Sequence, residues 1–554
     1  MATMNTKTFL FCLCAASILV PAAAIADGLK LTPVPAAMPK AVGVPTPSAL
    51  SPELIQTPVA TGAMALENPS KNFAYYGFAA NGPLVPGANA VQSKDNLVEA
   101  TKTEPDKNTY LVMSGLTGPD AGYDYGTHFI FQGHEVGVAA ADGKAQGYLT
   151  RINLDADVWH RVTLLGETAT DGNPLPPVDG STWDPFARRL LLSVEDVSKG
   201  GIWQASTDFP ARIDNLTGVI GVGGYEGIQV DKDGTVWIVE DSGGKTGANA
   251  KHAKQPNSFV YRFIPKDKTD LLKGGRLEAL QVMDAKGEPV TFHDGKADDD
   301  IMAAGVKDIH TYGLALKTKW VTVHDTDKDG IGPFSANTAA KAAGATPFKR
   351  PENGLFRPGS DFSEFVFDET GDTNADTEAG QAYGGFGAVL SLKQASASAM
   401  EGELRLVYLG DAEHTGFDNL AFWSADQVMF VEDRGDGLHA QKNALDSGWV
   451  IDLAADYAKD GTLPVRFLAE GRDPLATIDS GLAALKDAGF QNEGDNEITG
   501  IYISDGDASP EGLLGAKVPT PFENGWRFFY TQQHGENVTF EVFRKANVLK
   551  TAAK

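Results

Sequence analysis

Short apolar runs separated by turn residues recur along most of the chain. From about Tyr110 onward, runs rich in β-branched and aromatic residues alternate with Gly, Asp and Asn turns. The clearest runs are 234–240, 258–263, 404–409, 427–431 and 526–530. Each is of strand length, and turns of this kind join antiparallel strands. The pattern predicts an all-β fold, with short helical insertions between strands at 338–344 and 478–488.

Two stretches of this pattern resemble each other. Residues 226–241 and 418–433 share one order: an acidic head, a short strand, an Asp-containing turn, a second strand and two final acids. A two-strand unit repeated with acids at its ends is typical of successive β-propeller blades. A β-sandwich array would share the strands but would not require acids at equivalent strand ends. We therefore expect a β-propeller that forms a single domain over residues 66–554.

The first 65 residues follow a different pattern. Lys7, the apolar stretch 8–20 and Ala24-Ile25-Ala26 have the order of a general secretory signal peptide, which predicts that residues 1–26 are removed. A buried N-terminal helix is the alternative. Seven prolines between residues 27 and 65 predict an extended Pro/Ala-rich linker. We expect a periplasmic or secreted protein, because no later stretch has the length of a transmembrane segment.

The composition narrows the classes of function. The chain has 554 residues, with 73 Asp and Glu against 47 Lys and Arg, and a net charge of -26. Such a chain repels phosphate backbones and anionic lipids, so binding of nucleic acid or of a membrane surface is disfavoured. Both cysteines, Cys12 and Cys14, lie in the predicted signal peptide. The mature chain would therefore lack disulfides, thiolate catalysis and iron–sulfur clusters.

Several carboxylates stand at the heads or ends of predicted strands. They are Glu135, Glu195, Glu226, Glu352 and Glu497. In a propeller such positions face one mouth of the central channel, where converging carboxylates stay ionised only beside a cation, and calcium is the cation that oxygen donors suit best. A solvated surface acid is the alternative for each of them. The segment 325–330 begins like an EF-hand loop, but Ala336 replaces the required Glu, so a solvated turn is expected.

Two basic residues are candidate catalytic groups. Arg350 lies two residues before Glu352, and its planar guanidinium can hold two oxygens of a phosphate. His534 follows the strand 526–530 and could be a metal ligand, a phosphate donor or a proton shuttle. A surface arginine and a hydrogen-bonded structural histidine are the alternatives.

An ordered set of sequence blocks resembles the PhoX-type bacterial alkaline phosphatases, the exported calcium- and iron-dependent phosphomonoesterases. The blocks are 133–135, 179–185 with 195–196, 226–228, 258–280, 344–352, 419–422, 497–500 and 533–534. The resemblance implies a six-bladed propeller with a metal cluster at one channel mouth. It also implies that Glu226 and Glu352 are metal ligands, that Glu135, Glu195 and Glu497 bind calcium, that Arg350 holds the substrate phosphate, and that His534 lies at the mouth.

The chain also departs from that family. It has no cysteine for the iron site, Gly133 stands where the family has an Asn that contacts phosphate, and Tyr225 stands where it often has His. We therefore predict a monomeric, exported, calcium-dependent phosphatase of small phosphomonoesters, and the missing cysteine argues against iron. One alternative is a calcium-binding propeller that has lost catalysis with the iron site. Another is a related propeller hydrolase that acts on phosphodiesters, phytate or lactones.

Overall fold

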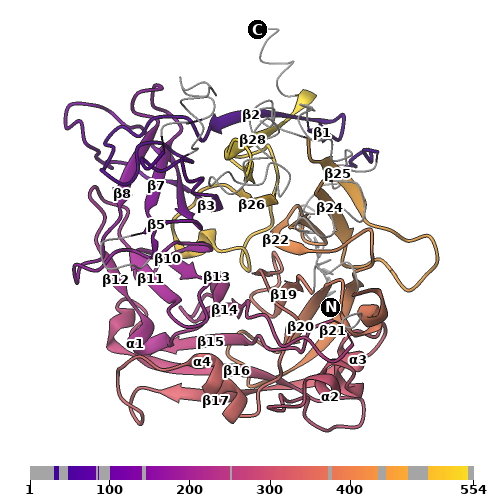
Figure 1. Ribbon diagram of the computed structural model, residues 1–554. Helices are drawn as coiled ribbons and strands as arrows, with labels where there is room; N and C mark the ends of the chain where they lie inside the picture. Colours follow the sequence, from indigo (N-terminus) through magenta and orange to yellow (C-terminus); the bar gives the residue numbers. More distant parts are fainter. Residues whose placement is uncertain are drawn as a thin grey trace, which may run out of the picture.

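The computed structural model describes residues 30–35, 48–82, 85, 100–139, 145–249, 253–371, 377–433, 445–471 and 497–546. The predicted signal peptide and the helical insertion predicted at 478–488 lie outside these residues. Antiparallel sheets surround a common centre, with few helices between them (Figure 1). No helix among the described residues is long and apolar enough to cross a membrane.

The first two sheets have four strands each. The first has the order β3-β4-β7-β8, and the second has the order β12-β11-β10-β9. Their bounds are β3 Pro105–Val112, β4 His128–His134, β7 Leu149–Asn153, β8 Val162–Gly166, β9 Ser181–Asp184, β10 Arg189–Val194, β11 Gly201–Ala205 and β12 Ile213–Asn215. A small hairpin of β5 (Val138–Ala139) and β6 (Ala145–Gln146) follows β4.

A nine-stranded sheet joins the next two groups of strands through β17. The groups are β13 Tyr225–Val230, β14 Val236–Glu240, β15 Val260–Pro265 and β16 Gly275–Val282, and β18 Gly354–Phe356, β19 Glu364–Glu369, β20 Ala388–Gln394 and β21 Glu401–Leu409. The strand β17 (Leu316–Asp325) pairs with both β16 and β21.

Two further sheets complete the arrangement. One has the order β1-β25-β24-β23-β22 and the other β2-β28-β27-β26. Their bounds are β22 Phe417–Phe422, β23 Gln427–Glu432, β24 Ser447–Asp452, β25 Val465–Ala469, β1 Ala49–Leu50, β26 Glu497–Ser504, β27 Arg527–Gln533, β28 Val538–Arg544 and β2 Leu54–Ala60. The helical elements are α1 Thr217–Ile220, η1 Leu271–Lys273, α2 Ala297–Ile301, α3 Ala304–Ile309, α4 Ala336–Ala342, η2 Thr377–Tyr383 and η4 Pro510–Gly512.

The first strand of each group lies innermost, and these strands contact one another in a closed ring. The contacts run from β3 to β9, β13, β18, β22 and β26, and from β26 back to β3. A closed ring of this kind leaves short, protected sheet edges. The prediction of an all-β propeller is confirmed. The number of six blades stays a prediction, and the groups of strands described above support it.

The N-terminal part of the chain differs from the expected linker. Within residues 27–65, β1 pairs with β25, and β2 pairs with β28 to complete the last sheet. Figure 1 shows β2, in indigo, beside β28, in yellow, so an early and a late strand of the chain pair in one sheet. Pro58 is accommodated because β2 is an edge strand, where a missing N–H breaks no ladder bond. The propeller strands therefore begin at Ala49 rather than after residue 65.

The repeat seen in the sequence corresponds to equivalent pairs of strands. Residues 226–241 form β13 and β14, and residues 418–433 form β22 and β23. In both pairs the register shifts at the head of the inner strand, between Tyr225 and Ile228 and between Phe417 and Leu420. Such bulges redirect side chains beside functional sites. The predicted helix at 338–344 corresponds to α4, where the Ser335 side chain accepts a hydrogen bond from the Thr338 N–H.

Candidate metal centre

Each of the six innermost strands brings one carboxylate to the centre of the ring. Asp106, Glu226 and Asp418 lie where the strands β3, β13 and β22 shift register. The other carboxylates stand just before or at the first residue of β9, β18 and β26: Asp179, Glu352 and Glu497. The second strands add Glu135 directly after β4 and Glu195 directly after β10. These eight side chains are called the acid belt below.

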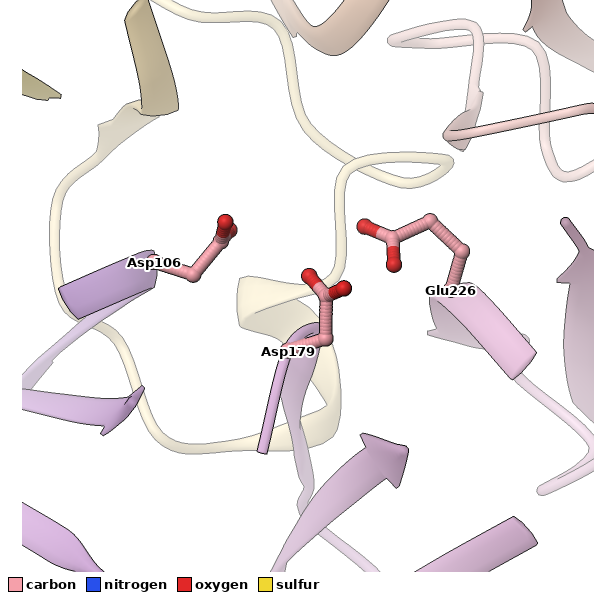
Figure 2. A group of neighbouring side chains, drawn as sticks. All are labelled: Asp106, Asp179 and Glu226. Atoms are coloured by element: carbon pink, nitrogen blue, oxygen red, sulfur yellow. The ribbon is translucent and has the colours of Figure 1, made fainter. Parts of the chain in front are cut away.

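The carboxylates of the acid belt approach one another closely. In four overlapping groups of three, one oxygen from each residue lies within 4.8 Å of the others. The groups are Asp106, Asp179 and Glu226; Asp106, Glu135 and Glu497; Glu135, Asp179 and Glu195; and Glu226, Glu352 and Asp418. Figure 2 shows the first group, in which the carboxylates of three different strands or strand heads point toward one another.

The inner part of the acid belt is buried. Asp106 and Glu226 are each 2% exposed, Asp179 is 5% exposed and Asp418 is 6% exposed. Burial and the charges of neighbouring carboxylates raise the pKa of Asp106, Glu226 and Asp418 well above its usual range. Burial also raises the pKa of Asp179 to about 6. The free energy cost of ionising these groups together is therefore high unless a cation accompanies them.

Two carboxylate oxygens in this cluster have no partner. Among the described residues, Glu226 Oε2 and Asp418 Oδ2 are buried and make no hydrogen bond. A buried, unpaired carboxylate oxygen is costly, and a divalent cation is the ordinary way to satisfy several such oxygens at once. Every candidate group found in the described part of the chain consists of carboxylates alone. The donor set thus fits a hard cation such as calcium.

Asp106 shows how neighbouring strands orient a member of the belt. Its carboxylate accepts hydrogen bonds from Thr499 Oγ1 at 3.0 Å and from Gln533 Nε2 at 2.8 Å. These donors lie in β26 and β27, which close the ring beside β3. The position of Asp106 therefore depends on the closure of the ring.

Lys107 is a buried cation beside the acid belt. It is 2% exposed, and within the described ranges its Nζ makes no hydrogen bond. Burial lowers the pKa of Lys107, whereas the charges of Asp418 and Asp106 raise it. A single ammonium cannot balance eight carboxylates, so their joint ionisation requires further positive charge.

Arg350 is held at the edge of the acid belt in an unusual conformation. Its φ is +59°, and Thr370 N donates to its carbonyl at 2.8 Å. The guanidinium donates from Nε to both oxygens of Asp241 at 2.9 Å and from Nη2 to Asp241 and Glu352. Burial acts to lower the pKa of Arg350, but Asp241 and Glu352 raise it well above its usual value. No hydrogen bond within the described residues uses Nη1, which leaves that donor for an anion.

His534 lies at the same mouth. Its Nδ1 is 3.3 Å from Glu104 Oε1, and its Nε2 is 3.4 Å from Glu497 Oε2. The side chain is 22% exposed, and the residue has a φ of +64°. His534 therefore touches the acid belt through Glu497 and also reaches solvent.

The structure brings together all seven residues singled out in the sequence. Glu135, Glu195, Glu226, Glu352 and Glu497 belong to the belt, Arg350 reaches it through Glu352, and His534 reaches it through Glu497. Their roles stay predictions.

Five further residues of the site were missed as ligands or partners: Asp106, Lys107, Asp179, Asp241 and Asp418. In the repeated units 226–241 and 418–433, Asp418 stands at the head that Glu226 occupies in the first unit, and Asp241 is the last residue of that first unit. The repeat could therefore have identified both acids.

Gly133 occupies the position where the PhoX-type family has an asparagine. A Cβ at Gly133 would lie 2.3 Å from Val178 Cγ1, so this position has no room for an asparagine side chain. Its neighbour His134 is fully buried and stacks on Tyr148.

The EF-hand-like segment forms a turn after β17, in which Lys328 pairs with Asp325. That turn agrees with the expected solvated loop.

The comparisons with known proteins agree with this geometry. The family model described as "Alkaline phosphatase PhoX" matches residues 253–509. This part of the chain is therefore similar in sequence to the PhoX family, in agreement with the resemblance seen in the sequence blocks. A solved structure of PhoX from Pseudomonas fluorescens in complex with vanadate, a transition-state analogue, is 11% identical and superposes with a TM-score of 0.53 over 93% of this chain and 98% of that chain. At this identity the superposition supports the fold alone, which is the propeller described above.

Other matches are weaker. A putative TolB from Agrobacterium tumefaciens is 10% identical and covers 67% of this chain and 85% of its own, with a TM-score of 0.29. A nidogen/laminin complex is 9% identical and covers 67% of this chain and 84% of its own, with a TM-score of 0.28. These scores are too low to support an inference. No curated protein matches the sequence.

Proposed function

We propose that this PhoX-type chain is an exported, calcium-dependent phosphatase that hydrolyses phosphomonoesters of small molecules. The signal peptide would direct it through the general secretory route to the periplasm or the medium, where it would act as a monomer. The observation that carries the proposal is the acid belt, whose carboxylates converge beside the partly buried guanidinium of Arg350. Two buried oxygens of the belt have no hydrogen-bond partner among the described residues.

Calcium ions would be held by the acid belt. Glu226, Glu352 and Asp418 offer one all-oxygen group, and the other groups share Asp106, Glu135 and Asp179. Bound calcium would supply positive charge that neutralises the phosphoryl oxygens as charge develops on them. The lack of cysteine in the predicted mature chain argues against the iron site of the family.

Arg350 would bind the phosphoryl group. Its Nε and Nη2 are committed to Asp241 and Glu352, which fix the plane of the guanidinium. The remaining donors on Nη1 would then meet a phosphoryl oxygen without a further change of rotamer, and this preorganisation is what stabilises a transition state. Asp241 is therefore a positioning residue for Arg350.

His534 would act at the mouth beside Glu497. An imidazole can donate a proton to the leaving alcohol, and the partial exposure of His534 allows it to recover a proton from solvent. Its contacts with Glu104 and Glu497 would hold the ring in place.

The test measures phosphate release from a phosphomonoester before and after chelation, and after calcium is restored. We expect activity to disappear on chelation and to return with calcium. Arg350→Ala should lower kcat/KM about 100-fold or more, whereas Arg405→Ala, a change at an exposed arginine of β21, should not. Equal turnover after thorough chelation would refute the metal role. Calcium binding without hydrolysis of any phosphoester would instead favour the non-catalytic propeller.

A further inference from the structure

A cavity of about 460 Å³ opens beside one end of the acid belt. This volume is in the range of sites that hold small molecules. Its walls come from the first two sheets and from the loops that connect them. The lining includes Glu135, Asp179 and Glu195, which form one of the candidate metal groups. A phosphoryl group bound at that end of the belt would therefore have this cavity next to it.

Part of the lining of the cavity is apolar. The indole of Trp203 lies in the wall, and Pro174, Pro176 and Pro177 form a rigid segment beside it. Trp203 is 5% exposed and packs within the hydrophobic cluster of these sheets. Such a wall offers a flat apolar face to the C–H groups of a ligand.

The lining also offers hydrogen-bonding groups, and Asn215 is the cross-strand partner of Trp203. Asn215 Oδ1 accepts from Thr217 N at 2.7 Å, and within the described residues its Nδ2 makes no hydrogen bond. Asn173 uses its N–H groups toward Asp171, which leaves Asn173 Oδ1 as an acceptor. Hydroxyl groups both donate and accept, so they suit such a mixed set of donors and acceptors.

The charge of the cavity limits what it can accept. Beyond the three acids shared with the belt, its charged lining residues are Asp171, Asp196 and the single cation Lys199. Asp196 is engaged by Ser198 and by the Lys199 N–H. A lining with more acids than cations disfavours a ligand that carries additional phosphate groups.

We propose that this cavity is the subsite for the leaving group, and that it selects monophosphate esters of neutral polyhydroxy alcohols such as sugars and polyols. This inference rests on the proposed phosphatase function. The alcohol would place its C–H face on Trp203 and its hydroxyl groups toward Asn173 and Asn215, while the phosphoryl group meets the acid belt. Phytate and bisphosphates would be poor substrates because their extra anionic groups would meet Asp171 and Asp196.

The test compares kcat/KM for glucose 6-phosphate, methyl phosphate, phosphocholine, fructose 1,6-bisphosphate and phytate, with phosphate release as the readout. Methyl phosphate has a leaving group too small to use the cavity, and both it and glucose 6-phosphate release a simple alcohol. We expect glucose 6-phosphate to exceed methyl phosphate about tenfold, the value of one or two net hydrogen bonds. The bisphosphate and phytate should fall below glucose 6-phosphate.

A matched pair of variants assigns the preference to the cavity. Asn215→Asp keeps the acceptor that caps Thr217 N but removes the Nδ2 donor and adds a negative charge. It should raise KM for glucose 6-phosphate about fivefold more than KM for methyl phosphate, because only the larger alcohol uses the Nδ2 donor. Asn524→Asp adds the same charge at an exposed position before β27 and should change KM for neither substrate.

The outcomes separate this inference from the function on which it rests. Hydrolysis of methyl phosphate without preference for glucose 6-phosphate, or a preference that Asn215→Asp does not reduce, overturns the leaving-group subsite and leaves the phosphatase function standing. Equal or better use of phytate, the bisphosphate or the cationic ester phosphocholine overturns the proposed selectivity. Failure to hydrolyse any ester in the presence of calcium overturns the phosphatase function and the subsite with it.

Discussion

Glu240 is a buried carboxylate whose ionisation should set part of the pH dependence of stability. It is the last residue of β14, directly before Asp241, and it is 0% exposed. Its Oε2 accepts from Tyr261 Oη at 3.0 Å and from Phe259 N at 3.2 Å, and Asn337 Nδ2 lies 3.1 Å from both oxygens. Burial nevertheless raises the pKa of Glu240 from 4.5 to about 7, since these hydrogen bonds only partly offset the cost of desolvation.

The size of the effect follows from that shift. A change from 4.5 to about 7 is 2.5 pKa units, which at about 1.4 kcal/mol per unit is about 3.4 kcal/mol. Because the folded state binds the proton more tightly than the unfolded state, this contribution to stability is complete below pH 4.5. It is lost as the pH rises through about 7, and about 2.5 kcal/mol of it disappears between pH 5 and pH 8.

The perturbation is Glu240→Gln, which has nearly the same shape and stays neutral at every pH. Urea denaturation of the calcium-saturated protein, followed by tryptophan fluorescence, gives the free energy of unfolding at pH 5 and pH 8. Wild type should lose about 2.5 kcal/mol more than Glu240→Gln across that interval. Glu401→Gln, at an exposed position that begins β21, serves as the matched control and should behave as wild type. An unchanged pH dependence in Glu240→Gln would show that this carboxylate does not titrate in the interval.

Three further predictions concern the site. Calcium at 100 times its dissociation constant should raise the free energy of unfolding by about 2.7 kcal/mol per site, measured by denaturation with and without chelator, and no shift would argue against calcium in the belt. Asp241→Asn should lower kcat/KM about 10- to 100-fold with an unchanged far-UV circular dichroism spectrum, because Arg350 loses the anion that orients it; wild-type kinetics would remove Asp241 from that role. Glu369→Gln should raise KM, because Glu369 supports the backbone directly before Arg350. Its Oε1 accepts a hydrogen bond from Lys349 N at 2.7 Å, and its Oε2 lies 2.6 Å from His310 Nε2. A fall in thermal stability with unchanged KM would mean that these contacts have a structural role alone.

The propeller architecture could be predicted from the sequence because each of its strands is recognisable from the local pattern of residues. Each strand needs only a short apolar run and a turn, and the unit at 226–241 recurs at 418–433. The same local reasoning failed for β2, since a proline at residue 58 argues against a strand unless the strand lies at a sheet edge. Whether β2 lies at an edge depends on its pairing with β28, which is far away in the sequence.

The candidate site was predicted unevenly for a related reason. Glu226 and Glu352 stand in distinctive sequence motifs. The sequence around Asp106 has no such motif, and its role becomes visible only when the closed ring brings β26 and β27 beside it. The ion pair of Arg350 with Asp241 joins residues that are 109 positions apart. The sequence could single out Arg350 because basic residues are sparse, but its pairing with Asp241 is determined by the tertiary structure alone.

The pairing of β2 with β28 also has a kinetic consequence. Residues 54–60 meet residues 538–544 only after nearly the whole chain has been made, and contacts of such long range form slowly. Because the acid belt draws one carboxylate from every innermost strand, a partly folded chain holds only fragments of it. Completion of the binding site and closure of the ring should therefore be one cooperative event, in which a cation that binds the acid belt would stabilise only fully assembled molecules.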